Sequence, residues 1–348
     1  MKFLQKSLPL LSRLTLIFTF LVILAGSVVR VTQSGMGCPD WPKCFGYYIP
    51  PSDPDQVNFH PNQAYTKGMM VIVNDTLWRA KQDFSSTAAF DRTSWEKYPK
   101  HDYADFIVYQ TWVEYINRLL GALLGLFVLA VMVASLSYWK TDKLVPLYSF
   151  ILLFLTGFQA WLGKLVVDGN LIPQSISIHM LAALLLLLFV QLLANRLKPK
   201  LEAPSRTTSL AWIALGAVFL TVIQVLIGTQ VREEIDMVAE QLGHQSRELW
   251  IDRLSSVLTL HKAFSLVLVT INGILIYQLL QQKTAFRSKQ AKVLGACIAT
   301  EIMLGIVLNY FNIPQAGQSL HLLVSCLIFS IQFGIFISLR KKQSVISN

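Results

Sequence analysis

Three histidines lie inside apolar stretches of the chain that are long enough to cross a membrane. They are His179, His261 and His321, and each lies a few residues from one end of its stretch. An ionisable side chain in such a place is costly and indicates function by default. Two imidazoles on neighbouring helices can bind one iron from opposite sides, so His261 and His321 predict a bis-histidine heme site. The alternative is a histidine that hydrogen-bonds across a helix interface.

An internal repeat relates two of these histidines. Residues 162–179 read LGKLVVDGNLIPQSISIH, and residues 304–321 read LGIVLNYFNIPQAGQSLH, at an offset of 142 positions. The segments 26–30 (GSVVR) and 228–232 (GTQVR) match each other at an offset of 202. Repeats with an even number of spans have parallel orientation. The repeat therefore predicts two tandem four-helix units.

The repeat places Asn117 where the other unit has His261. An asparagine offers an amide oxygen but no imidazole nitrogen, and it is a poor iron ligand. A cation follows in both units, Arg118 after Asn117 and Lys262 after His261. Such cations suit the propionates of a heme, and they suit equally well the anchoring of a helix end at the membrane surface.

Glu114 is the candidate catalytic residue. It lies three residues before Asn117 and has no acidic counterpart in the other unit, where Leu258 stands. A carboxylate here could act as a general base or stabilise a developing cation. It could also pair with Arg118, four residues further along the same helix face, and the two interpretations are compatible.

The composition requires helices in a membrane to position these side chains. Hydrophobic residues make up 53% of the 348, and charged residues only 14%, against about 25% in soluble domains. Soluble and disordered classes are therefore excluded. The net charge of +10 comes from short basic loops and does not indicate nucleic acid. An all-α polytopic membrane protein is predicted, with eight spans at about 10–30, 112–137, 144–163, 174–195, 207–230, 257–280, 291–310 and 318–338.

Lysine and arginine concentrate in alternate loops, which predicts that both termini lie in the cytoplasm. The segments predicted to lie outside are 31–111, 164–173, 231–256 and 311–317. The predicted divisions are a first helix (1–30), a long outer loop (31–111), the rest of the first unit (112–200) and the second unit (207–340). Within the loop, the insertion 50–105 is expected to form an ordered cap, with 87–110 able to lie as an interfacial helix.

The four cysteines divide between two environments. Cys38 and Cys44 start the outer loop, in a compartment where disulfides persist, so a disulfide between them is favoured over a metal site, which needs more ligands. Cys297 and Cys326 fall inside spans and are interpreted as small packing residues.

Taken together, these features resemble the heme A synthase family. The resemblance rests on eight helices in two parallel units, on Glu-x-x-Asn-Arg at 114–118, on three span histidines and on the cysteine pair after the first span. It covers nearly the whole chain apart from residues 50–105. In that family a ring methyl of heme O is oxidised to the formyl group of heme A for cytochrome c oxidase, in the bacterial inner membrane.

The resemblance implies a role for each candidate residue. Its cofactor is heme b, held here by His261 and His321. The substrate heme O would lie with His179 and the position of Asn117, beside Arg118 and the essential acid Glu114. The cysteine pair would pass reducing equivalents. Implied partners are the lipid membrane, an upstream heme O synthase and the oxidase assembly machinery, and a homo-oligomer stays open.

Asn117 departs from the family pattern. The substrate iron could be five-coordinate, another residue such as His60 or His101 could bind it, or the activity could be lost. Because Glu114 and Arg118 remain in register, an active variant is favoured. The alternatives are an electron-transfer cytochrome with heme b alone, and a non-catalytic heme carrier or oxidase-assembly factor.

Overall fold

A computed structural model describes residues 2–98, 106–168, 175–198 and 208–340. The chain forms two compact units, one made of Met1–Leu24 with Leu123–Asn348 and the other of Ala25–Ala122. The described residues contain eight helices that are long and apolar enough to cross a membrane, which confirms the predicted all-α polytopic protein. They are α1 (Lys2–Val31), α2 (Val108–Ser135), α3 (Leu144–Asp168), α4 (Ser175–Arg196), α5 (Thr208–Gln241), α6 (Ser256–Gln281), α7 (Ala285–Tyr310) and α8 (Gln315–Arg340).

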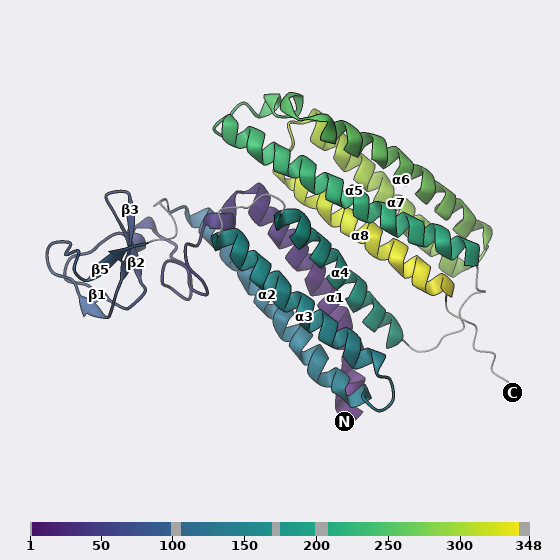
Figure 1. Ribbon diagram of the computed structural model, residues 1–348, viewed down its shortest axis with the longest axis horizontal. Helices are drawn as coiled ribbons and strands as arrows, with labels where there is room; N and C mark the ends of the chain where they lie inside the picture. Colours follow the sequence, from purple (N-terminus) through teal and green to yellow (C-terminus); the bar gives the residue numbers. More distant parts are fainter. Residues whose placement is uncertain (1, 99–105, 169–174, 199–207, 341–348) are drawn as a thin grey trace. The chain divides into compact units, whose positions relative to one another are not determined.

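Helices α5 to α8 lie side by side as a bundle (Figure 1). Small side chains on α5, among them Ala211, Ala214 and Ala217, are buried in one cluster with apolar side chains of α6 and α8. Small residues let helix backbones approach closely, which is how packing holds helices together where lipid removes the hydrophobic drive. Side-chain caps at Ser255 and Thr284 mark where α6 and α7 begin.

Helices α1 to α4 form a second hydrophobic core. It lies in the compact unit Met1–Leu24 with Leu123–Asn348, which also contains the α5–α8 bundle. Buried side chains of α1, α2, α3 and α4 meet around Leu8, Val128, Leu152 and Val190. Helix α4 also packs against α5 and α8, where Leu187 is fully buried. The boundaries between the two compact units fall inside α1, after Leu24, and inside α2, after Ala122. They do not test the predicted division into 1–30, 31–111, 112–200 and 207–340, which stays a prediction.

A buried polar chain joins three helices of the α5–α8 bundle. The Thr221 hydroxyl donates to Oε1 of Gln332 at 2.9 Å, and Nε2 of Gln332 donates to Oδ1 of Asn272 at 2.9 Å. Nδ2 of Asn272 donates to the Leu268 carbonyl at 2.8 Å. Asn272 and Gln332 each lie eleven residues, about three turns, after His261 and His321. The chain of bonds therefore fixes the helix faces that carry the histidines.

We expect Gln332→Leu to destabilise the protein by about 1–2 kcal/mol, because it removes two interhelical hydrogen bonds and leaves Thr221 and Asn272 without their partner. Thermal unfolding in detergent measures the effect. Gln281→Leu, at an exposed position near the end of α6, is the matched control. An unchanged or higher Tm for Gln332→Leu would contradict the prediction.

Helix α5 is longer than the sequence predicts. The apolar run ends near residue 230, but the helix continues to Gln241. In this extension Val231, Ile235 and Val238 recur at helical spacing and are buried against Trp250 and Ile313. An amphipathic helix needs only one apolar stripe, so a hydropathy average ends it too early.

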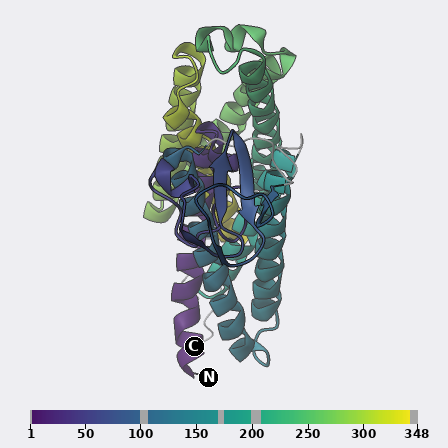
Figure 2. The same cartoon turned by 90° about the vertical axis from the view of Figure 1, so that its left-hand side faces the viewer.

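The segment between α1 and α2 contains two small sheets (blue in Figure 2). Strands β1 (Ala64–Tyr65) and β4 (Phe84–Ser85) form one, and β2 (Met70–Val73), β3 (Thr76–Ala80) and β5 (Trp95–Lys97) form the other, in the order β2-β3-β5, with both sheets antiparallel. Asn74 and Asp75 both adopt positive φ, which a two-residue hairpin turn requires. The described part of the insertion, residues 50–98, is thus folded, and its role as a cap stays a prediction.

The expected interfacial helix over 87–110 is wrong. Its described part holds β5, and α2 begins only at Val108. The cause is a cluster of aromatic rings. Trp95 is buried, and its ring centroid lies within 6.5 Å of the ring centroids of Phe59, Tyr65, Phe84 and Phe90. Aromatic side chains bury large areas. Packing of Trp95 in this cluster therefore stabilises its segment as a strand of the sheet and not as a helix.

Candidate functional site

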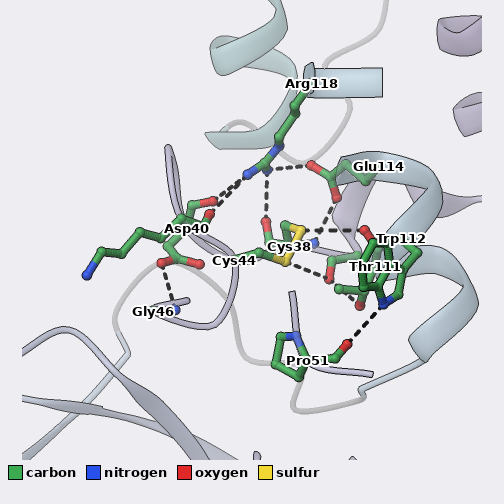
Figure 3. Close-up of a disulfide and its surroundings, with 11 residues drawn as sticks. Cys38, Asp40, Cys44, Gly46, Pro51, Thr111, Trp112, Glu114 and Arg118 are labelled. Atoms are coloured by element: carbon green, nitrogen blue, oxygen red, sulfur yellow. Dashed lines mark hydrogen bonds and ion pairs between the residues drawn. A yellow bond between two sulfur atoms is a disulfide. The ribbon is translucent and has the colours of Figure 1, made fainter. Parts of the chain in front are cut away.

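The loop that follows α1 is packed tightly against the start of α2. A Cβ atom at Gly37 would lie only 2.6 Å from the backbone of Gln110, so this position requires glycine. The Thr111 hydroxyl donates to the Gly37 carbonyl at 2.8 Å. Cys38 and Cys44 form the predicted disulfide, and both are buried (Figure 3). The loop is thus closed by a covalent bond next to α2.

Glu114 lies at the centre of this contact, on the first turns of α2. Its side chain is only 3% exposed. Oε2 accepts a hydrogen bond from the backbone N–H of Cys38 at 2.8 Å, and Oε1 pairs with Nη2 of Arg118 at 2.5 Å. The predicted ion pair along the helix is therefore present. Both carboxylate oxygens are thus held, one by the loop and one by the helix.

The Arg118 side chain binds two partners, the disulfide loop and the carboxylate of Glu114. Nη1 donates to the carbonyls of Asp40 at 2.6 Å and Lys43 at 3.2 Å, and Nη2 donates to the Cys38 carbonyl at 3.2 Å. Figure 3 shows the guanidinium between the loop and the acid. A rigid fork of donors is suited to gathering several oxygen atoms. Sequence reasoning missed this role, because the bonded carbonyls lie 75 or more positions away.

Asp40 closes the other side of the loop. Oδ2 accepts from the backbone N–H of Gly46 at 3.0 Å, while Oδ1 is buried without a partner among the described residues. Burial raises the pKa of this carboxyl above its ordinary value, although the hydrogen bonds from Gly46 and Phe45 and the charge of Arg118 oppose the shift.

A pH dependence of the loop follows. Because the folded pKa lies above the unfolded one, the contribution of Asp40 to stability is present at acid pH and is lost as the pH rises through the folded value. We expect the disulfide of the native chain to be reduced faster, relative to Asp40→Asn, as the pH rises from about 4 to 7. The measurement is the rate at which a phosphine reduces the disulfide in the native chain and in Asp40→Asn. Asp75→Asn, in an exposed turn, is the control. A ratio of rates independent of pH would contradict the prediction.

Asn117 occupies the same kind of position as its counterpart His261. A Cβ atom at Gly26 of α1 would lie 3.9 Å from Oδ1 of Asn117, and one at Gly228 of α5 would lie 3.2 Å from Cε1 of His261. Both side chains therefore lie against a repeat-related glycine of the preceding helix. Oδ1 of Asn117 is buried, with no partner among the described residues. The paired glycines were visible in the repeat, but their contacts were not.

His261 of α6 and His321 of α8 lie close to each other. Their ring centroids lie 6.3 Å apart, and the Nδ1 atom of each is buried without a hydrogen bond in the described structure. With a metal–nitrogen distance of about 2 Å and the ring centre about 1 Å further on, two imidazoles on opposite sides of one metal have centroids roughly 6 Å apart. The pair thus fits a heme iron.

The remaining histidines separate into different surroundings. His179 on α4 belongs to the unit that also holds α5 to α8, its Nδ1 is buried without a partner in the described chain, and its carbonyl accepts from Gln159 at 3.0 Å. His60 lies in the loop region with Nε2 3.4 Å from a carboxylate oxygen of Asp55. His101 lies outside the described residues.

Helices and buried polar groups of this kind define a multi-pass membrane protein with chemistry-bearing side chains inside its spans. The chain belongs to the COX15-CtaA family, described as cytochrome oxidase assembly protein, whose model matches residues 10–84 and 80–333. It is similar to the heme A synthase of Shewanella oneidensis, with 26% identity over 93% of this chain and 86% of that protein. It is also similar to the heme A synthases of Ehrlichia canis (24%, covering 89% and 87%) and Beijerinckia indica (22%, covering 90% and 88%).

Proposed function

We propose that this protein is a heme A synthase, an oxidoreductase that converts a ring methyl group of heme O into the formyl group of heme A. The observation that carries the proposal is the buried Glu114, held between Arg118 and the Cys38–Cys44 loop. A simple electron-transfer cytochrome has no use for such an acid. Similarity to three heme A synthases over about nine-tenths of the chain supports the same conclusion.

The reaction sets the task of the chain's own residues. Conversion of a methyl to a formyl group, with water as the oxygen source, removes four electrons and four protons from the methyl carbon and one water molecule. Glu114 would stabilise positive charge that develops at this carbon, or accept a proton from the attacking water. Arg118 keeps the carboxylate in place. The oxidation would take place in two steps of two electrons and two protons each; the disulfide beside Glu114 can accept those of one step, and an external oxidant would reoxidise the cysteine pair before the second step.

Heme b is the proposed resident cofactor, and His261 and His321 would hold it. The centroid distance of 6.3 Å supports this assignment. A heme with two axial imidazoles supplies one-electron transfer when bound. Glycines at 228 and 305 leave room for the two rings, since a Cβ there would lie 3.2 Å and 3.7 Å from the respective Cε1 atoms.

On the substrate side, His179 would bind the iron of heme O and Asn117 would not. The repeat supports this assignment, because His179 is the counterpart of His321. The carboxylate of Glu114 and its bonds to Arg118 and Cys38 are intact beside Asn117, which supports an active enzyme rather than a decayed one.

The proposed location is the bacterial inner membrane, with both termini in the cytoplasm. The basic loops of the sequence support this orientation, and it places the disulfide in an oxidising compartment. The product would supply cytochrome c oxidase, and a heme O synthase would provide the substrate.

Heme extraction tests the proposal. Cells that make the full chain together with a source of heme O are extracted, and their hemes are separated by chromatography. Heme A, absent from cells with the heme O source alone, would support the synthase. Heme B and heme O without heme A would refute it, and would favour the cytochrome if the purified protein holds heme b, or the carrier if it holds heme O.

A further inference from the structure

Glu301 of α7 lies against one of the two proposed heme ligands. Its Oε1 is 3.3 Å from Nδ1 of His321, and it also accepts a hydrogen bond from the hydroxyl of Ser325, one turn further along α8. The two α8 side chains are four residues apart and so share one helix face. Oε2 of Glu301 is buried, with no partner within the described chain. A carboxyl group thus lies in a span and contacts an imidazole.

The two histidines of the pair differ in this respect. The ring of His261 has an amide nitrogen of Gln224 3.4 Å from its Nε2, and no carboxylate contacts it among the described residues. In the first unit the repeat places Gln159, again an amide, where the second unit has Glu301. The amide of Gln159 bonds to the carbonyl of His179 and not to its ring. The acidic contact is specific to His321.

We infer that Glu301 is a positioning residue for the heme b, a deepening that rests on the proposed function. Nδ1 of His321, 3.3 Å from Oε1 of Glu301, would donate its proton to this carboxylate in the heme-loaded protein, which would set the tautomer and leave Nε2 for iron. Histidines that bind metals commonly donate their second nitrogen to a carboxylate in this way, which orients the ring and makes it a stronger ligand.

This contact has a consequence for the redox equilibrium of the heme. A stronger imidazole donor and a nearby negative charge both favour the more positive, ferric iron over ferrous iron. Glu301 therefore lowers the reduction potential of the heme. Packing by itself would not do so, because glutamine fills the same volume as glutamate.

The test uses the full chain purified in detergent, with heme content measured as the pyridine complex and the midpoint potential by redox titration. For Glu301→Gln we expect unchanged heme content and an about tenfold rise in the ferrous-to-ferric ratio at a fixed potential, which is about 59 mV for one electron. Glu240→Gln, which removes an exposed carboxylate of α5, is the control and leaves the potential unchanged.

Glu301→Asp is a second variant that keeps the charge and shortens its reach. We expect it to raise the potential too, with altered g values of the low-spin ferric heme, because the contact with Nδ1 is lost. Potentials and g values equal to those of the native protein in both variants would overturn the inference and leave the proposed function intact. A native protein without heme b, or one that keeps it in His321→Ala, would instead overturn the cofactor site.

Discussion

We expect cells that carry Glu114→Gln in place of the native chain to form at least about 100-fold less heme A, with the heme b content of the purified protein unchanged. The substitution removes a preorganised negative charge near the reacting carbon. Removing one such electrostatic contact typically lowers the catalytic rate by about 10²- to 10³-fold. Glutamine keeps an oxygen that can accept from the N–H of Cys38. Arg118 keeps its three backbone carbonyls. The loop should therefore stay folded.

The measurement is the ratio of heme A to heme O after extraction, normalised to the amount of protein. Glu96→Gln is the matched control, because Glu96 forms an ion pair of the same 2.5 Å length with Arg79 but is about 40% exposed. Exposed pairs contribute little, and heme A formation should be unaffected. Full activity of Glu114→Gln would remove Glu114 from the mechanism and leave the disulfide loop as a structural feature.

His261→Ala and His321→Ala should each reduce the heme b content of the purified protein to less than about one tenth. Each removes one of the two side chains proposed to bind the heme iron. Heme A formation should fall with the heme. Absorbance of the pyridine complex per mole of protein measures the content, and thermal unfolding separates heme loss from misfolding.

His179→Ala is the matched control for this pair. His179 is the repeat counterpart of His321 and is half-buried on its helix, as His321 is, but the proposal assigns it to the substrate. We expect this variant to keep heme b and to lose heme A. If all three variants kept heme b, the pair at 6.3 Å would be a packing contact across the bundle and not a heme site.

The amino-acid sequence by itself determined the membrane class, the eight spans and the internal repeat. Each depends on local composition or on spacing along the chain: an apolar run near 20 residues spans a bilayer core of about 30 Å. The ion pair between Glu114 and Arg118 depends on a spacing of four along one helix. The disulfide followed from the compartment of two nearby cysteines.

Only the tertiary structure decided which backbone surrounds Glu114 and which side chain faces His321. The N–H of Cys38 lies 76 positions from Glu114 in the chain, and Glu301 contacts His321 across two helices. The strands around Trp95 and the extension of α5 to Gln241 likewise depend on partners elsewhere. Such contacts depend on how helices are rotated and which loops fold back. Rotation is set by packing of many side chains at once, and no local pattern contains it.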